Sequence, residues 1–404
     1  MSAAEPTAQN ASVRPFQVEI PGEEIDDLRH RIAATRLPEK EPVEDASQGV
    51  QLATIQALAR YWATEYDFRR VETRLKAFPH FITEIDGLDV HFIHVRSPEE
   101  NALPMIITHG WPGSVIELLN VIDPLSNPTA HGASAEDAFH LVVPSIPGYG
   151  FSGKPTETGW GPERIGRAWD VLMKRLGYPQ YVAQGGDWGA IIVDAMGVRA
   201  PEGLLGIHTN MAGSVPPEIW KLFGFGTADP PPPDLSPDEQ RAYEELRSEF
   251  TEGVGYAVEM ALHPQTLYGI ADSPVGLAAW MLDHDANSYE DIAHAFVDGQ
   301  PVGNLTRDEV LDNVTFYWLT NTGVSSGRLY HESKLGFFDA KGVTVPAAVS
   351  TFAREIYQVP QSWAERAYPK LIYFNELDKG NHFAAWQEPE LFTEEVRAGF
   401  RSLR

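Results

Sequence analysis

The sequence predicts an α/β fold, in which a mostly parallel central sheet follows a helical segment and is interrupted by a helical insertion. Three observations support this prediction. Strand-like apolar runs alternate with helical spacing from residue 81 onward, a glycine-rich strand–turn–helix pattern surrounds Asp187, and residues 215–335 are mainly helical and aromatic. With 404 residues, the chain is long enough to hold one enlarged domain or two.

The N-terminal region shows helical periodicity and no strand signal. Residues within 25–32 and 55–62 recur at helical intervals, so we predict a helical N-terminal extension over residues 15–80. Residues 1–14 are polar, rich in Ala, Ser and Thr, and without the apolar core of a signal peptide. We therefore expect them to form a flexible tail.

The periodicity changes after residue 80. Alternating apolar residues on either side of Asp86-Gly87 predict a hairpin over residues 81–95. Further strands are expected at residues 105–109, 139–144, 181–184, 205–209, 343–349 and 370–374, a rigid proline-rich loop at 229–233, and a closing helix at about 389–400. The sheet domain would thus comprise residues 81–214 and 336–404, with residues 215–335 inserted as a helical cap.

Composition excludes several classes of function. The chain has 31 basic and 57 acidic residues, a net charge of −26 with His neutral, which disfavours nucleic acid and anionic membrane surfaces as partners. It has no cysteine, so disulfides, thiolate metal sites and Cys nucleophiles are excluded. No apolar stretch approaches the roughly 18–20 residues of a membrane span, and we expect a cytoplasmic protein.

The peptide Gln184-Gly185-Gly186-Asp187-Trp188-Gly189-Ala190 stands between an apolar run and an amphipathic segment. This is the pattern of the nucleophile elbow in an α/β-hydrolase fold, where glycines permit the sharp turn that exposes the central side chain. Here the central residue is Asp187 rather than Ser or Cys. A carboxylate nucleophile suits displacement at an electrophilic carbon, as in an epoxide or an alkyl halide, rather than attack on esters or peptides.

A second motif, His109-Gly110-Trp111-Pro112-Gly113-Ser114, directly follows an expected strand. In a hydrolase of this class the loop supplies a backbone N–H to the oxyanion hole, so we assign Trp111 and Trp188 as the two N–H donors. We expect the peptide bond before Pro112 to be cis. The alternative is an ordinary turn at the end of a strand.

The remaining catalytic candidates come late in the chain. His382 lies in the loop between the last expected strand and the last helix, where this fold places its catalytic His, and we assign it as the general base for water. The acid that orients the imidazole should follow the strand at 343–349, and Glu355 does so. Glu376 and Asp378, which precede His382 in the same connection, are the alternatives.

Together these blocks resemble the microsomal-type epoxide hydrolase family of the α/β-hydrolase superfamily. The resemblance extends from Arg14 over nearly all of the chain, and its most family-like segments are residues 15–21, 35–38, 109–114, 147–152, 185–189, 272–280 and 380–385. The membrane-anchoring helix of the animal members is absent, which implies a soluble, bacterial-type relative. Asn381 stands where a Gly is common before the His, and we expect a minor effect because Asn tolerates left-handed backbone angles.

The resemblance also implies two cap tyrosines that hydrogen bond the epoxide oxygen, and Tyr256 and Tyr330 match their positions. Ring opening produces an alkoxide, which phenol groups can bind and protonate. Taken without the resemblance, Tyr268 and Tyr317 are competitors. The family match supports Glu355 as the acid.

The predicted function is therefore hydrolysis of an epoxide by water to a vicinal diol through an aspartyl ester, with no cofactor and no metal ion. The cap aromatics favour a hydrophobic or aromatic epoxide; they are Trp220, Phe223, Phe225, Trp280, Phe316 and Trp318. One alternative is a haloalkane dehalogenase, in which Trp188 would bind the halide. Another is a non-catalytic ligand-binding protein on a hydrolase scaffold. A homo-oligomer is left open.

Overall fold

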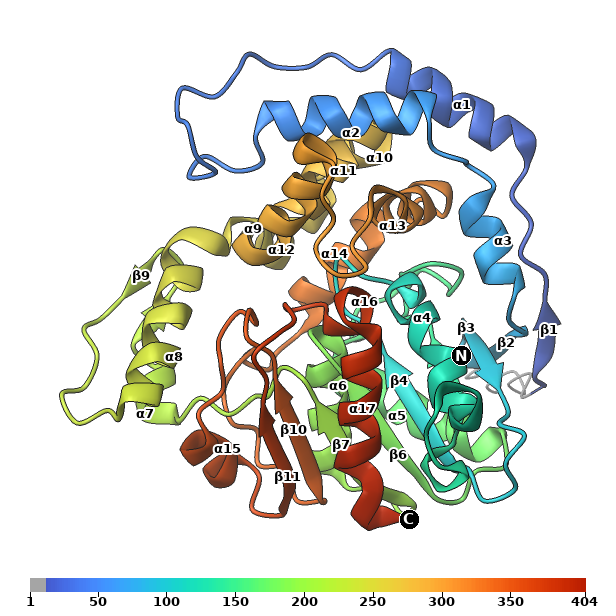
Figure 1. The fold of residues 1–404 in the computed structure, drawn as a ribbon, viewed down its shortest axis with the longest axis vertical. Coiled ribbons are helices and arrows are strands. Elements are labelled where there is room, and N and C mark those ends of the chain that lie inside the picture. Colours follow the sequence, from blue (N-terminus) through green and yellow to red (C-terminus); the bar gives the residue numbers. More distant parts are fainter. Residues whose placement is uncertain (1–11) are drawn as a thin grey trace, which may run out of the picture.

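A computed structural model describes residues 12–404, which form a nine-stranded sheet with helices on both faces and a helical layer above it (Figure 1). The strand order is β1-β2-β3-β5-β4-β6-β7-β10-β11. The strands from β5 to β11 in this order pair in parallel, and β1, β2 and β3 are added antiparallel. Their bounds are Arg14–Phe16 (β1), His80–Ile85 (β2), Leu88–Val95 (β3), Leu103–Thr108 (β4), Phe139–Pro144 (β5), Tyr181–Gly185 (β6), Leu204–Thr209 (β7), Ala347–Thr351 (β10) and Leu371–Glu376 (β11).

The strand predictions for the core are confirmed, with boundary shifts of which the largest is at the start of β10. Asp86 and Gly87 have φ values of 51° and 79°, as a two-residue hairpin turn between β2 and β3 requires. β10 was expected to begin at residue 343 and begins instead at Ala347. The preceding residue, Pro346, has no N–H to donate to a neighbouring strand, which explains the later start.

The prediction that the N-terminal extension contains no strand is wrong. Arg14–Phe16 forms β1, which pairs antiparallel with the start of β2. Three residues are too few to show an alternating pattern, and the strand forms because β2 offers an unpaired edge. The tail predicted for residues 1–14 lies mostly outside the described residues, and Arg14 itself belongs to the sheet.

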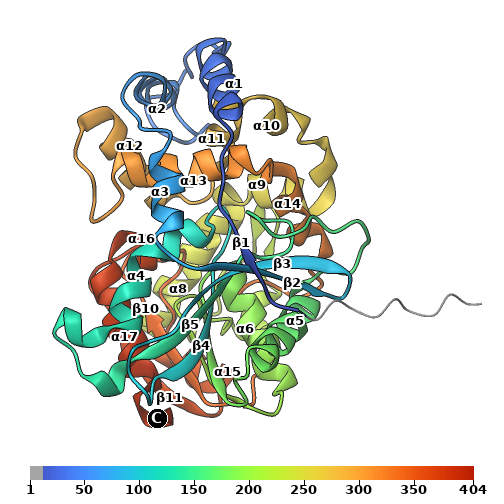
Figure 2. The ribbon, with the colours of Figure 1, turned by 90° about the vertical axis from the view of Figure 1, so that its right-hand side faces the viewer.

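Helices cover the two faces of the sheet. α4 (Val115–Ser126) and α17 (Pro389–Phe400) pack against each other on one face, and α5 (Pro162–Arg175) and α6 (Trp188–Arg199) pack on the other (Figure 2). The shorter helices α15 (Gln361–Ala367) and α16 (Ala384–Gln387) lie beside β11 and α17. The predicted closing helix at 389–400 is confirmed.

The segment between β7 and β10 is mainly helical and lies above the sheet (Figure 1). Its helices are α7 (Pro217–Trp220), α8 (Pro237–Ser248), α9 (Gly255–Leu262), α10 (Tyr268–Asp272), α11 (Pro274–Leu282), α12 (Ala286–Ala293), α13 (Arg307–Leu319) and α14 (Gly323–Glu332), and its two short strands are β8 (Phe223–Gly224) and β9 (Thr227–Ala228). Residues 229–233 have no regular structure, as their prolines predict.

The first two N-terminal helices lie across this segment rather than on the sheet (Figure 1), and the third packs against both α13 and α4. They are α1 (Gly22–Ala33), α2 (Leu52–Thr64) and α3 (Arg70–Lys76), and α1 and α2 both contact α11. The indole N–H of Trp62 donates to Thr315 over 3.0 Å, and the Tyr66 hydroxyl donates to Asp312 over 2.7 Å. Asp312 is fully buried and also binds Arg70 and Arg74, so the extension and the cap are joined by buried polar contacts.

Within residues 12–404, the structure contains no helix that is both long and apolar enough to span a lipid bilayer.

Candidate active site

Asp187 stands on the sharp turn between β6 and α6, two central elements of the fold. Its φ of 48° and ψ of −127° lie in a region that residues with a side chain rarely adopt. Glycines make the turn possible by their lack of a side chain. A Cβ on Gly185 would lie 2.2 Å from the backbone of Gly189, and a Cβ on Gly189 would lie 2.1 Å from the carbonyl oxygen of Thr108. The turn projects the carboxylate beyond the C-terminal edge of the parallel strands.

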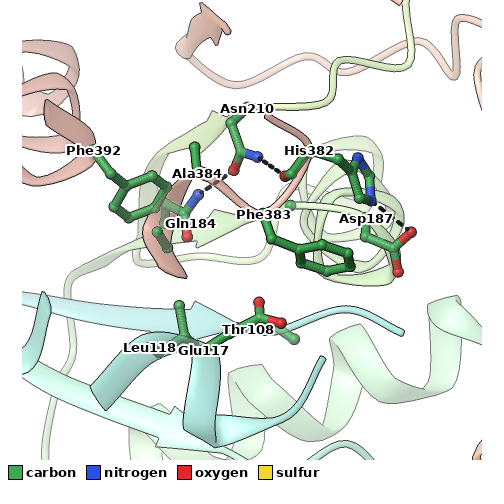
Figure 3. Close-up of a pocket in the computed structure, with 12 residues that line it drawn as sticks. Thr108, Glu117, Leu118, Gln184, Asp187, Asn210, His382, Phe383, Ala384 and Phe392 are labelled. Carbon is green, nitrogen blue, oxygen red and sulfur yellow. Dashed lines mark hydrogen bonds and ion pairs between the residues drawn. The ribbon is translucent and has the colours of Figure 1, made fainter. Parts of the chain in front are cut away.

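The carboxylate of Asp187 is buried and has different partners on its two oxygens. Oδ1 accepts a hydrogen bond of 2.6 Å from the backbone N–H of Trp111. Oδ2 lies 3.3 Å from Nε2 of His382 (Figure 3) and 3.7 Å from Nε2 of His284. Burial raises the pKa of Asp187, but the two imidazoles outweigh it and bring the pKa well below the ordinary range. Asp187 is therefore ionised at neutral pH.

The two predicted N–H donors of the oxyanion hole differ in this structure. Of the two backbone N–H groups, both within residues 12–404, the one of Trp111 is hydrogen bonded to Asp187. Trp188 is the first residue of α6, where backbone N–H groups have no partner inside the helix. The Trp111–Pro112 bond is cis, as expected.

His382 and Glu355 form a buried pair beside the nucleophile. Nδ1 of His382 is hydrogen bonded to Oε1 of Glu355, which also accepts from the N–H of Ile356 over 2.8 Å. Glu355 follows β10 and His382 follows β11, and these strands are parallel neighbours. Burial lowers the pKa of His382, but the carboxylates of Glu355 and Asp187 raise it well above its ordinary value. The imidazole is thus charged while both carboxylates are ionised.

The two alternative acids lie elsewhere. Glu376 is exposed and forms an ion pair of 2.9 Å with Arg241, and Asp378 is exposed at the surface. Neither contacts His382, so within residues 12–404 the structure brings Glu355 to the imidazole and leaves these two out. The loop that carries His382 is held by Asn210, whose amide nitrogen donates to the His382 carbonyl over 3.5 Å and whose oxygen accepts from Gln184 over 3.1 Å (Figure 3).

Tyr256 and Tyr330 come from α9 and α14 and meet above the elbow. The Tyr256 ring stacks on Trp111 with centroids 5.1 Å apart, and the Tyr330 ring stands edge-on to Trp188 at 4.7 Å and to Tyr256 at 6.0 Å. Burial raises the pKa of both phenols well above the usual value, so both keep their protons. The Tyr330 hydroxyl is buried without a hydrogen-bond partner among the described residues.

The competing tyrosines have other environments. Tyr268 is 67% exposed, and the Tyr317 hydroxyl donates to the Gly113 carbonyl over 2.7 Å. Most aromatics singled out in the cap also lie away from the elbow. Phe225 is 60% exposed, and Trp220 packs on Phe250.

Two buried titratable residues at the site were not predicted. His284, between α11 and α12, reaches the nucleophile from the cap, and nothing in the local sequence marks it as more than a polar residue in a helical region. Glu117, in the first turn of α4, lines the same small cavity as Asp187 and His382 (Figure 3). Burial, reinforced by the charge of Asp187, raises the pKa of Glu117 to about 8.

The expectation that Asn381 replaces Gly by adopting a left-handed backbone conformation is wrong. The left-handed backbone at this point belongs to Gly380, with φ of 88°, and Asn381 has no positive φ. Asn381 instead uses its side chain, donating to Asp291 over 3.0 Å and accepting from the N–H of Phe383 over 3.0 Å. The amide therefore stiffens the loop that carries His382.

One group of side chains within residues 12–404 brings together atoms of the kind that bind metal ions. Asp187, His284 and His382 each present one ligand atom, and these atoms lie within 4.8 Å of one another. The sequence separates these three residues widely, and their approach follows from the fold alone.

Comparison with known proteins gives the class of this chain in two steps. Residues 104–291 match the family model described as alpha/beta hydrolase fold, and residues 13–118 match the model described as Epoxide hydrolase N terminus. A candidate epoxide hydrolase of Stigmatella aurantiaca is 48% identical over 97% of this chain and 86% of its own. Epoxide hydrolase 1 of Sus scrofa is 34% identical over 96% of this chain and 89% of its own.

Solved structures agree. The juvenile hormone epoxide hydrolase of the silkworm Bombyx mori superposes with a TM-score of 0.83 and 31% identity, covering 98% of this chain and 96% of that one. The epoxide hydrolase of Aspergillus niger superposes with a TM-score of 0.79 and 28% identity, covering 98% of both chains. The chain has the α/β-hydrolase fold and belongs to the epoxide hydrolase family. The comparisons do not support a dehalogenase or a non-catalytic protein.

Proposed function

We propose that this protein hydrolyses an epoxide to a vicinal diol through a covalent ester on Asp187. The observation that carries the proposal is the position of an ionised carboxylate on a strained elbow, with two protonated phenols above it and a His–Glu pair beside it. This arrangement supplies a nucleophile, an acid for the epoxide oxygen and a base for water.

In the first step, Oδ2 of Asp187 forms a bond to a ring carbon while the carbon–oxygen bond of the epoxide breaks. The oxygen that is released takes a proton from the hydroxyl of Tyr256 or Tyr330. Buried phenols are suited to this role because they stay protonated in the resting enzyme and donate as negative charge develops on the oxygen.

In the second step, water attacks Cγ of the ester. Ester formation removes the charge of Asp187, so His382 loses one of the two carboxylates that raise its pKa and can lose its proton. The neutral imidazole then accepts a proton from water, and Glu355 stabilises the imidazolium that forms. The negative charge on Oδ1 meets the N–H of Trp111, and we assign the N–H of Trp188 as the second donor.

We propose a hydrophobic or aromatic epoxide as the substrate. Support comes from the rings of Trp111, Trp188, Tyr256 and Tyr330 at the elbow, and from a second small cavity of mainly apolar side chains under the cap. Phe383 lines both this cavity and the one beside Asp187.

The test is a panel of epoxides of different size and polarity, with separation of the diol enantiomers. We expect diol formation, fastest for apolar and aryl-substituted epoxides such as styrene oxide, and no halide release from a chloroalkane. Halide release without diol formation would overturn the proposal, and a preference for small polar epoxides would overturn the substrate class alone.

A further inference from the structure

A second histidine–carboxylate pair faces the nucleophile from the cap. His284 and Asp285 connect α11 to α12, and Nδ1 of His284 is 3.0 Å from Oδ2 of Asp285. The other oxygen of Asp285 accepts from the N–H of Ser288 over 2.8 Å, as the N-cap of α12. Asp285 therefore anchors the pair at the start of α12, and its carboxylate fixes the orientation of the His284 ring.

The free nitrogen of His284 points at the reacting atom. Nε2 lies 3.7 Å from Oδ2 of Asp187, and it is buried without a hydrogen-bond partner among residues 12–404. His284 is 2% exposed, so water does not satisfy this nitrogen from bulk solvent. Buried polar atoms are nearly always paired, and one left open against a nucleophile indicates a partner that arises during the reaction.

The atom that His284 faces has a particular fate in the proposed reaction. Oδ2 forms the bond to the substrate carbon, and it leaves Asp187 with the diol when the ester is hydrolysed. A leaving alkoxide needs a proton. The imidazolium form of His284 carries one on Nε2, and this N–H needs only a short approach to reach hydrogen-bond distance, about 2.9 Å.

We propose that His284, oriented by Asp285, is a further catalytic residue, the general acid that protonates Oδ2 as the diol leaves. The inference rests on the proposed function, because it assigns a role in hydrolysis of the Asp187 ester. It divides the second step between two histidines: His382 takes a proton from water, and His284 gives one to the departing oxygen.

The step balances in atoms and protons. Water transfers one proton to Nε2 of His382 and its hydroxyl to Cγ, the Cγ–Oδ2 bond breaks, and Oδ2 takes the proton of His284. Asp187 is left as a carboxylic acid, which ionises. The proton that His382 gives up when the ester forms and the proton that Asp187 releases at the end restore the tyrosine and His284, and His382 keeps the proton that it took from water.

The charges around His284 allow one of the two histidines to be protonated while the other is neutral. Its ring stacks on that of His382 with centroids 5.0 Å apart, so two adjacent cations repel once Asp187 is esterified. Asp285 remains ionised, because the neighbouring imidazole outweighs burial and brings its pKa to about 2. The titratable groups that face His284 or influence it are Asp187, Asp283, Asp285, His382, Glu117, Glu249 and Tyr256, whose ring centroid lies 5.0 Å from that of His284.

The test is single-turnover kinetics of His284→Gln with styrene oxide, with rapid quenching and mass measurement of the peptide that contains Asp187. We expect the ester to form at a rate of the same order as in the unchanged enzyme and to be hydrolysed about 100-fold more slowly, so that it accumulates. Normal ester formation in the same sample shows that the variant is folded.

The pH profile separates an acid from a merely structural residue. In the unchanged enzyme the rate constant for ester hydrolysis falls at low pH, as His382 becomes protonated, and at high pH, as His284 loses its proton. We expect the high-pH decline to be absent in His284→Gln. It should move to lower pH in Asp285→Asn, which keeps the cap of α12 but lowers the pKa of His284 by removing its anion.

The possible outcomes separate the role of His284 from the ester mechanism on Asp187. If the unchanged enzyme forms no ester on Asp187, the proposed function fails and the inference fails with it. If the ester forms in His284→Gln and is hydrolysed at the normal rate, if the high-pH decline persists in His284→Gln, or if it does not move in Asp285→Asn, the role of His284 alone is overturned.

Discussion

The two sides of the nucleophile are built alike but by different means. On the core side, Glu355 and His382 follow the neighbouring parallel strands β10 and β11, and their approach is fixed by the sheet. On the cap side, Asp285 and His284 occupy a connection between two helices, and their approach depends on how the cap lies on the core. A histidine–carboxylate pair can thus be positioned either by neighbouring strands of one sheet or by the packing of a cap on the core.

Removing Asp187 takes away the atom that both sides address, and it should have the largest effect. In Asp187→Ala no ester can form, and the rate of diol formation should fall by several orders of magnitude, measured by chromatography of the diol. Retention of full turnover in this variant would show that Asp187 is not the nucleophile.

Changing the core pair should slow one step selectively. Glu355→Gln removes the anion that stabilises the His382 imidazolium, so ester hydrolysis should slow by about 10³–10⁴-fold while ester formation continues. The low-pH decline of hydrolysis should also move to lower pH, because His382 loses a carboxylate that raises its pKa. Rapid-quench mass measurements across pH record both effects.

A matched control is available for that variant. Glu376→Gln changes the alternative acid, which is exposed and paired with Arg241, and it should leave both steps unchanged. An equal loss in Glu376→Gln and Glu355→Gln would contradict the assignment of Glu355.

The tyrosines belong to the cap side but act on the first step. Tyr256→Phe and Tyr330→Phe should each slow ester formation by about 10²–10³-fold, since each removes one donor to the developing alkoxide. Stopped-flow fluorescence, using the buried tryptophans near Asp187, follows this step. Tyr268→Phe, at an exposed position, should behave as the unchanged enzyme; slower ester hydrolysis in the Tyr256 or Tyr330 variants with normal ester formation would refute the roles given to them.

The smallest effect on chemistry is expected where the extension holds the cap. Asp312→Ala leaves the two guanidinium groups of Arg70 and Arg74 with one buried carboxylate, that of Glu309, in place of two. It should lower the free energy of unfolding by about 3–5 kcal/mol with a near-normal rate per folded molecule. Denaturant titration measures the loss. Glu376→Gln, which breaks an exposed ion pair, should cost at most about 1 kcal/mol, and equal losses in the two variants would show that the buried contact does not stabilise the cap.

The difference between the two sides also explains what the sequence could predict. The hydrolase elbow at Asp187 and the late His382 carry local signals, because glycine spacing and chain order reflect the sheet topology directly. Glu355 followed from the strand before it, although that strand begins later than expected. These three positions could be predicted from the sequence because each follows the end of a strand.

The remaining features required three-dimensional packing. His284 and Glu117 have no spacing that marks them, since a polar residue in a helical segment is usually a solvated one. β1 is too short for periodicity and depends on the edge of β2. The tyrosine positions came from family resemblance rather than from pattern, and the cap aromatics chosen by composition lie mostly away from the elbow.

The most direct test of the covalent role of Asp187 is a single turnover in water enriched in the heavy oxygen isotope, with enzyme in excess over a racemic aryl epoxide. Because the oxygen added to the first diol comes from Asp187, we predict unlabelled diol and heavy oxygen in the peptide that contains Asp187. Heavy oxygen in the diol of the first turnover, with none in that peptide, would mean that water attacks the epoxide directly and would contradict the ester mechanism.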